Sequence, residues 1–502
     1  MSDTNDSKKI GSPYMKILPP VAALMFAFCV NTIAQPVDND AEQQTNVAVR
    51  VDFSSTLQDW DGFGVTYVEL AQSIDPITDP QEYGGLSRLT RKKRREVLQL
   101  IFGADGLQPN IVKMFLDPHH QKTPDGAFDH ESTTQWMRYF VQEGIEITED
   151  RRGPGIEIIT TLYGPPAWAT SQKILRGRDL DPDEYTNLAK YMIDWVVFLV
   201  QKENLPVKYL SLHNEGDAPH RWPRDGSHGA IGDGRDYNVF WRPHQVTYFL
   251  EFMPSMIRDA GLDVGLTPGE TTYWRSFAAR WYHWAIHDSE IALNNMALIT
   301  SHGFGTGNAI DSRASDLLRM KRPELHAWTT SMTWGGKKGM KDFEFVEMIR
   351  RNIYEAKVNA LVPWAALQTD SWVGGDPNPG TAIFISDDGE YEIRPQYYYY
   401  KQLTRIGQRD MKVVEVETEV GSGIELIGFA SNGTNHPDAF VLMNLGSTES
   451  RVMIEVNGSA DDFLATRTSD QEQSVGIGRF EVKEGKIAYV APAGSVSTFV
   501  AN

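Results

Sequence analysis

The sequence predicts an α/β protein, a (β/α)8 TIM barrel with a C-terminal antiparallel β-sandwich that is joined to an N-terminal strand. Between residues 60 and 373, eight apolar strand-like runs alternate with helical or loop sequence. This alternation is typical of a parallel sheet, and eight such units are typical of a closed barrel. From about residue 410, short alternating stretches are separated by Gly, Asn and Ser, which is the pattern of an antiparallel sandwich. A length of 502 residues gives room for both.

These observations divide the chain into four parts. Residues 1–34 are interpreted as a signal peptide with an upstream extension. We expect residues 46–58 to be strand sequence that joins the sandwich, residues 59–409 to form the barrel, and residues 410–502 to form the sandwich domain.

The N-terminal part has the order of features found in a secretory signal peptide. Met15 and Lys16 give a basic start, residues 17–30 an apolar core, and residues 32–34 a small-residue cleavage site. The polar stretch before Met15 has the character of an upstream start that was assigned too early. The apolar core is too short for a membrane span with these flanks. We therefore expect a secreted or periplasmic protein that has no membrane contact after signal cleavage.

Composition excludes several classes of function. The single cysteine, Cys29, lies inside the expected signal, so the mature protein has no thiol for a metal site, a disulfide or a cysteine nucleophile. A formal net charge of −19 argues against nucleic acid and anionic membranes as partners. The histidines show no metal-ligand spacing, and no Gly-rich phosphate loop follows a strand. We expect neither a metal nor a cofactor.

The expected barrel strands are apolar runs that end in polar residues, as strands covered on both faces do. In chain order they lie at residues 62–66, 110–118, 156–170, 207–217, 263–274, 297–305, 324–335 and 360–373. Helices are expected at residues 90–102, 133–142, 181–199, 244–259, 275–287 and 343–357. The third helix opens with a cap residue, Asp181, followed by Pro182 at its first position.

The fourth expected strand ends in His213, Asn214 and Glu215. A carboxylate at the carboxyl end of a barrel strand lies where barrel enzymes place their chemistry. An Asn-Glu pair after a strand also fits a solvated loop start or a helix cap. These residues alone leave both interpretations open.

Four short motifs follow one another along the chain. They are Asp61 to Gly64 (DGFG), Tyr163 to Trp168 (YGPPAW), Leu212 to Glu215 (LHNE) and Pro268 to Glu270 (PGE). In this order and spacing they resemble glycoside hydrolase family 30, whose members are retaining (β/α)8 glycosidases with a β-sandwich. The resemblance extends from about residue 47 to the end. It implies a hydrolase that cleaves a β-linked polysaccharide or oligosaccharide, and we expect a monomer with carbohydrate as its partner.

The resemblance makes Glu215 the general acid/base. Such a residue has to hold a proton near neutral pH and give it to the leaving oxygen. Partial desolvation by aromatic neighbours such as Trp168 would raise its pKa. Asn214 would hydrogen-bond the sugar hydroxyl next to the anomeric carbon. Further substrate-binding residues are expected at other strand ends, namely Asp117, Tyr163, Trp168, His302, Ser331, Trp334 and Trp372.

The chain departs from the family at the nucleophile. The resemblance implies a Glu in a Trp-x-Thr-Glu context at the end of the seventh strand, where this chain has Trp328, Thr330 and Ser331. A serine hydroxyl does not stabilise an oxocarbenium ion as a carboxylate does, and Ser331 has no evident local base to activate it.

Three interpretations of this departure remain. Another carboxylate can serve, with Glu270 at the end of the fifth strand the best placed and Asp370 and Asp117 behind it. Alternatively, the mechanism is inverting, with a base that holds a water. In the third interpretation the chain binds glycans on the same scaffold without cleaving them. Glu270 is therefore a candidate catalytic residue that also fits a structural role at its strand end.

Overall fold

The computed structural model describes residues 46–71, 73, 75–77, 82–217, 237–275, 277–304, 310–335, 341–369 and 380–502. The expected signal peptide, Asp370 and Trp372 lie outside the described residues. None of the helices in these ranges is long and apolar enough to cross a membrane.

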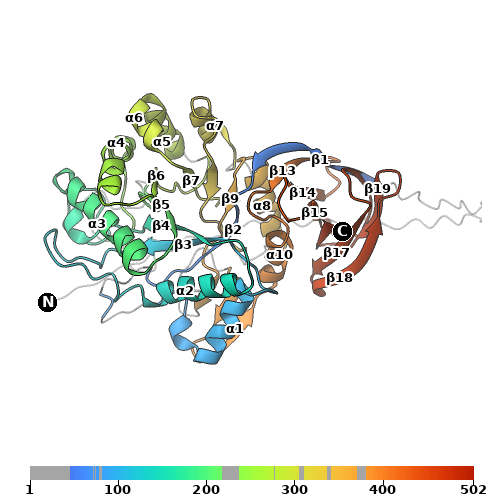
Figure 1. Cartoon of the computed structure of the whole chain (residues 1–502), viewed down its shortest axis with the longest axis horizontal. Helices are drawn as coiled ribbons and strands as arrows, with labels where there is room; N and C mark the ends of the chain where they lie inside the picture. Colours follow the sequence, from blue (N-terminus) through green and yellow to red (C-terminus); the bar gives the residue numbers. More distant parts are fainter. Residues whose placement is uncertain are drawn as a thin grey trace, which may run out of the picture. The chain divides into compact units, whose positions relative to one another are not determined.

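Eight parallel strands form the sheet at the centre of the barrel (Figure 1). They are β2 (Gly62–Thr66), β3 (Ile111–Leu116), β4 (Glu157–Leu162), β5 (Val207–Ser211), β6 (Gly265–Thr267), β7 (Ile299–Ser301), β8 (Ala327–Thr329) and β9 (Ala360–Leu361). Their order in the sheet is β6-β5-β4-β3-β2-β9-β8-β7. Each strand lies inside one of the eight predicted runs, so the predicted fold class is confirmed.

Isolated bridges close the sheet between its two outermost strands, β6 and β7. Leu266 pairs with Met296, and Thr271 pairs with Ser301, both in parallel orientation. The N–H of His302 donates to the carbonyl of Thr271 at 2.8 Å. The carboxyl ends of all eight strands therefore meet at one end of the barrel, where a ligand site is expected.

Helices surround the barrel strands (Figure 1). They are α1 (Arg91–Phe102), α2 (Gln135–Asp150), α3 (Tyr185–Val197), α4 (Pro243–Asp259), α5 (Phe277–Asp288), α6 (Glu290–Asn295), α7 (Arg313–Arg319), α8 (Glu344–Tyr354) and α10 (Pro395–Thr404). The start of α3 matches its sequence signal. The Asp181 carboxylate accepts a hydrogen bond from the Asp183 N–H, and Pro182 opens the 3-10 turn that leads into the helix.

A nine-stranded sheet forms the sandwich, in the order β18-β17-β20-β15-β14-β13-β1-β16-β19. Its strands are β1 (Val47–Asp59), β13 (Lys412–Thr418), β14 (Ile424–Ala430), β15 (Ala439–Asn444), β16 (Ser450–Asn457), β17 (Asp462–Ser469), β18 (Glu472–Glu481), β19 (Lys486–Ala491) and β20 (Ser495–Ala501). Strand β1 lies between β13, to which it is antiparallel, and β16, to which it is parallel. The sheet is therefore mixed, whereas the sequence suggested antiparallel pairing only.

The two edge strands of this sheet approach each other. The ring of Phe480 on β18 lies 5.6 Å from the ring of Tyr489 on β19, measured between centroids. Since β18 and β19 stand at opposite ends of the strand order, the sheet folds over on itself and encloses an apolar core, as a sandwich does.

Aromatic residues connect the barrel with the sandwich. Trp60 is fully buried between Phe63 at the first barrel strand and Phe429 on β14, with centroid distances of 4.8 and 5.3 Å. Its indole N–H donates to the carbonyl of Gly407 at 3.0 Å. Residues from Thr45 onward form one compact unit, so the domain boundaries at residues 59 and 410 stay a prediction.

Candidate active site

Four of the predicted site residues come one to four positions after the end of a barrel strand. Glu215 follows β5, Glu270 follows β6, His302 follows β7 and Ser331 follows β8. Because these strands are parallel and adjacent around the barrel, their carboxyl ends bring the four residues to the same end. The candidate site is built from these strand ends.

Glu215 has an unusual backbone conformation. Its φ angle is 46°, in the left-handed region that costs a non-glycine residue of the order of 1 kcal/mol. Two hydrogen bonds to the neighbouring strand fix this turn, from the Glu215 N–H to Glu270 O at 2.7 Å and from the Glu270 N–H to His213 O at 2.8 Å. The side chain of Glu215 is 10% exposed, and its Oε1 lies 2.8 Å from Nδ1 of His302.

Glu270 is fully buried, and both of its carboxylate oxygens have partners. Oε1 accepts a hydrogen bond from the Thr161 hydroxyl at 2.6 Å. Oε2 lies 2.9 Å from Nε2 of His302 and also forms an ion pair with Lys113. Burial would raise the pKa of Glu270, but the Lys113 ammonium and the His302 hydrogen bond outweigh it and lower that pKa to about 2. Glu270 is therefore ionised.

Lys113 connects three strands through the barrel interior. It belongs to β3, and its ammonium contacts Glu270 after β6 and the carbonyl of Thr330 after β8, the latter at 3.2 Å. Its side chain is as fully buried as that of Glu270. The sequence alone does not indicate a role for Lys113 or Thr161 in the site. The available sequence signal was a lone lysine in the apolar run Ile111 to Leu116.

His302 lies between the two carboxylates and is itself buried. Burial would lower the pKa of His302, but its hydrogen bonds to Glu215 and Glu270 outweigh burial and raise that pKa. The sequence suggested that His302 faces the sugar. In the structure both of its ring nitrogens lie within hydrogen-bond distance of carboxylates. These contacts do not test whether His302 also contacts a substrate.

Several buried polar atoms near these strand ends have no hydrogen-bond partner in the described part of the chain, and two of them belong to predicted site residues. These two are the Ser331 hydroxyl oxygen and Oδ1 of Asn214. The backbone of each is anchored, because the Gly303 N–H donates to Ser331 O at 2.7 Å and the Asn214 N–H donates to Leu162 O at 3.1 Å. Such atoms are uncommon because leaving them unsatisfied is costly.

The aromatic candidates differ in their surroundings. Trp168 is 8% exposed, and its indole N–H donates to Gln121 O at 3.1 Å. Tyr163 is fully buried against Phe115, with ring centroids 4.4 Å apart. Neither contact tests the predicted role in substrate binding.

Trp334 is fully buried, and its ring lies 4.9 Å from that of Tyr400 on α10, between centroids. Its indole N–H donates to Trp364 O at 2.9 Å. Trp334 is therefore packed in the core, and these contacts do not test its predicted substrate role. Trp372 lies outside the described residues.

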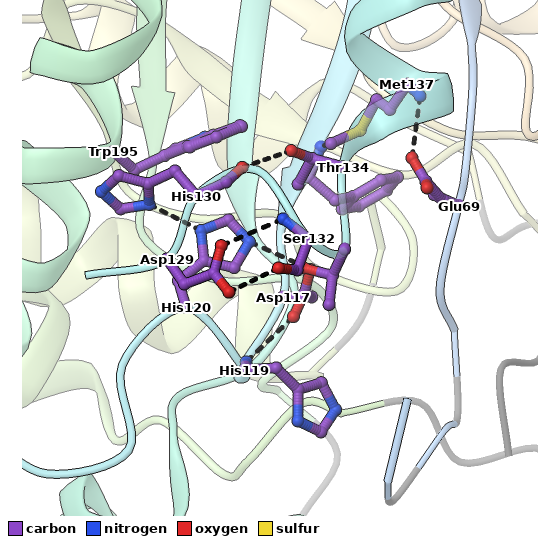
Figure 2. Close-up of polar contacts among 12 residues, drawn as sticks. Glu69, Asp117, His119, His120, Asp129, His130, Ser132, Thr134, Met137 and Trp195 are labelled. Atoms are coloured by element: carbon purple, nitrogen blue, oxygen red, sulfur yellow. Dashed lines mark hydrogen bonds and ion pairs between the residues drawn. The ribbon is translucent and has the colours of Figure 1, made fainter. Parts of the chain in front are cut away.

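Asp117 is oriented toward the loop that follows β3 (Figure 2). Its Oδ1 accepts from the His119 N–H at 2.9 Å, while Oδ2 accepts from the Thr133 hydroxyl at 2.6 Å and lies 3.0 Å from Nε2 of His120. Burial would raise the pKa of Asp117, but its histidine and threonine neighbours outweigh burial and lower it to about 2. These bonds hold the loop together and leave the predicted sugar contact untested.

The same chain of contacts continues to a second histidine, which we did not identify from the sequence. Nδ1 of His120 lies 2.8 Å from Nδ1 of His130, and Nε2 of His130 lies 2.9 Å from the Asp194 carboxylate on α3. Burial and the nearby His120 lower the pKa of His130 to about 4. The ring of Trp195 covers both imidazoles, at 5.0 and 5.4 Å between centroids.

His213 and Asp217 shape the turn around Glu215. The His213 ring lies against Gly269, where an added Cβ would approach it to 2.3 Å, and burial lowers the pKa of His213 to about 3. One carboxylate oxygen of Asp217 accepts from both the N–H and the hydroxyl of Thr272, at 3.0 and 2.8 Å. Within the described ranges, no group of three or more His, Cys, Asp or Glu is arranged to hold a metal ion.

No family model and no curated protein matches the chain. Among solved structures, it is similar to a glycoside hydrolase family 30 endoxylanase from Clostridium papyrosolvens C71, with 17% identity, a TM-score of 0.66, and coverage of 91% of this chain and 100% of that one. It is also similar to the catalytic domain of the family 30 xylanase C from Talaromyces cellulolyticus, with 15% identity, a TM-score of 0.67, and coverage of 91% of this chain and 100% of that one. A third similar structure is the endo-β-1,6-glucanase BT3312, with 16% identity, a TM-score of 0.66, and coverage of 91% of this chain and 94% of that one. The chain therefore has a (β/α)8 fold like that of these family 30 glycoside hydrolases.

Proposed function

We propose that this chain, which has the fold of family 30 glycosidases, is a glycoside hydrolase that cleaves a β-linked polysaccharide or oligosaccharide with Glu215 as general acid/base. The observation that carries the proposal is the position of Glu215. It lies just after the fourth barrel strand, in a turn of unfavourable φ that two interstrand hydrogen bonds maintain. Strain of this kind persists where the surroundings enforce it, and it is concentrated at functional sites.

Asn214 and Glu215 have complementary chemistry for a sugar. The unpartnered Oδ1 of Asn214 would accept a hydrogen bond from a sugar hydroxyl, which removes the cost of leaving that atom unsatisfied. Glu215 would give a proton to the leaving oxygen of the glycosidic bond. A hydrogen bond to the hydroxyl next to the anomeric carbon strengthens as the oxocarbenium-like transition state forms.

We assign Glu270 to positioning and not to nucleophilic attack. A retaining enzyme needs a second carboxylate about 5–5.5 Å from the first, with access to the anomeric carbon. Glu270 is fully buried, and its two oxygens are occupied by Thr161, His302 and Lys113. Of the other two candidate carboxylates, Asp117 is bonded to the loop after β3, and Asp370 lies outside the described residues.

Replacing Glu215 with Gln tests this function. The amide keeps the size of the side chain but has no transferable proton, so hydrolysis of any accepted β-glycan should fall by about 10²–10⁴-fold. The substrate panel should include xylans and β-1,6-glucans, since the similar structures include a xylanase and a β-1,6-glucanase. Unchanged turnover in Glu215→Gln would remove the assignment.

A second candidate function is glycan binding without cleavage. Ser331, at the position where the resemblance implies the nucleophile, favours it, because a buried neutral hydroxyl replaces the expected carboxylate. In that case wild-type protein would bind a β-glycan in calorimetry and release no sugar from it.

Export with removal of residues 1–34 and a monomeric state are also part of the proposal. N-terminal sequencing of the mature protein tests the cleavage, and light scattering tests the monomeric state.

A further inference from the structure

One imidazole connects the proposed acid/base to the buried ion pair beneath it. Nδ1 of His302 lies 2.8 Å from Oε1 of Glu215, and Nε2 lies 2.9 Å from Oε2 of Glu270, which also pairs with Lys113. We propose that His302 is a positioning residue that stores the proton used by Glu215, and that Glu270 and Lys113 hold it in that role. The inference rests on the proposed acid/base role of Glu215.

The hydrogen-bond geometry requires a definite number of protons. An ionised carboxylate only accepts hydrogen bonds, so a ring nitrogen that faces one has to carry a hydrogen. Glu270 is ionised because of Lys113, and Nε2 of His302 therefore carries a hydrogen. The remaining contact, between Nδ1 and Glu215, needs one more proton, which either partner can hold. Without it, the lone pair of Nδ1 would face a carboxylate oxygen.

Glu215 and His302 therefore titrate as a pair that holds one transferable proton. This explains how the site can contain an acid near neutral pH. A pKa of Glu215 raised by aromatic neighbours, as the sequence suggests, is not needed to supply this acid.

The other charged and titratable groups around His302 are few in the described part of the chain. Lys113 from β3 disfavours its positive charge, while Glu215 after β5 and Glu270 after β6 favour it. His213 at the end of β5 would repel it if charged, but burial lowers the pKa of His213 to about 3 and keeps that ring neutral. The two carboxylates thus decide the balance, and the pKa of His302 is raised.

The proposed step conserves atoms and charge. The bond between the anomeric carbon and the leaving oxygen breaks, its electron pair stays on the oxygen, and that oxygen takes a proton from Glu215. Glu215 draws this proton from Nδ1 of His302, which becomes neutral while its Nε2–H still donates to Glu270. The water that attacks the anomeric carbon releases a proton, and this proton returns to Nδ1 through Glu215.

Nitrogen-15 NMR of histidine-labelled full-length protein tests the stored proton without any substrate. The His302 signals are assigned by their loss in His302→Gln, with His302→Asn as a second assignment variant. We expect both ring nitrogens of His302 to be protonated at neutral pH in the wild type. In Glu215→Gln the pKa of His302 should fall by about one unit or more, because a carboxylate partner is lost. A neutral His302 in the wild type at that pH would overturn the inference.

Kinetics test whether the stored proton is used. His302→Gln should lower kcat on a natural glycan by roughly 10–100-fold, less than loss of the donor itself, with KM unchanged and the alkaline limb of the pH profile moved to lower pH. Aryl glycosides with acidic leaving groups need little protonation of the leaving oxygen. On these substrates, kcat of His302→Gln should therefore fall much less. Equal losses on both substrates, or an unmoved pH profile, would contradict the inference.

His326 provides a matched control. It also hydrogen-bonds a carboxylate, with Nδ1 2.8 Å from Oδ2 of Asp61, but it directly precedes β8 and so lies at the opposite end of the barrel. His326→Gln should keep the wild-type pH profile. Full hydrolysis in Glu215→Gln would overturn the proposed function, whereas the NMR result decides the state of His302 separately.

Discussion

Lys113 and Glu270 form an ion pair in which both side chains are completely inaccessible to solvent, although 157 positions separate them in the sequence. A buried pair of this kind contributes little net stability relative to an apolar pair, but removing one partner leaves an uncompensated charge in the interior. The pair therefore fixes how β3 and β6 face each other beneath the candidate site.

Lys113→Met and Glu270→Gln should each lower the free energy of unfolding by about 3–5 kcal/mol, because each leaves one buried charge alone. The double variant should recover part of this loss. Urea denaturation of the three variants gives the coupling directly. Lys92→Met is the control, since Lys92 and Glu96 pair on the exposed surface of α1 and should contribute less than about 1 kcal/mol. The prediction would be contradicted if Lys113→Met and Glu270→Gln lowered the free energy of unfolding no more than this control does.

The depressed pKa of Asp117 predicts a loss of stability in acid. Its pKa is about 2 in the folded protein against an ordinary value of 3.8, so the folded state favours the ionised form. The resulting stabilisation, about 2 kcal/mol, is present above pH 3.8 and is lost as the pH falls toward 2. In Asp117→Asn, the free energy of unfolding should depend less on pH in this window. Asp125→Asn, an exposed position in the same loop, should keep the wild-type dependence, and identical curves for both variants would oppose the prediction.

Gly269 should not tolerate a side chain. Its φ is +94°, and a Cβ there would lie 2.3 Å from the His213 ring, so Gly269→Ala should cost about 2–4 kcal/mol of stability and disturb the turn at Glu215. Gly261→Ala is the matched control, because Gly261 has a φ of +72° but open space around it. The control should cost only the backbone strain of about 1 kcal/mol. Thermal unfolding of both variants measures the difference in stability. Equal losses of stability would show that the His213 ring moves aside for the added methyl group.

Ser331→Glu should create a site for covalent chemistry. The new carboxylate would stand at the end of β8, across the barrel mouth from Glu215, where a retaining enzyme has its nucleophile. With a fluorinated glycoside, mass spectrometry should then detect a glycosyl adduct on residue 331. Ser331→Gln has the same size without a nucleophilic oxygen and should stay unlabelled. No adduct in Ser331→Glu, with the variant folded, would mean that the position does not face the anomeric carbon.

The barrel could be predicted because its strands are covered on both faces. Such strands are continuous apolar runs, and each of the eight runs from Gly62 to Val373 contains one strand of the observed barrel. The ends of these runs also indicated Glu215, His302 and Ser331. Strand ends are local features of the sequence, so a single chain is enough to find them.

The contacts across the barrel could not be predicted in the same way. Periodicity indicates which face a residue lies on but not which residue of another strand it meets, so the partners of Lys113 remained unknown. His302 was correctly placed at a strand end, yet its two carboxylate partners depend on the spacing of three neighbouring strands. The sequence also does not reveal that Tyr400 from α10 packs against Trp334.

The position of β1 between β13 and β16 sets the order in which this protein can be completed. Asp52 on β1 bonds to Asn457 on β16, and the two are 405 positions apart. At a synthesis rate of about 5–20 residues per second, roughly 20–80 s pass between the appearance of one and of the other. Until β13 is synthesised, both edges of β1 lack their partner strands, and Val49 and Val51, which are buried in the finished sheet, lack their cover. The sandwich can therefore be completed only after β16 has been synthesised, about 400 residues after β1.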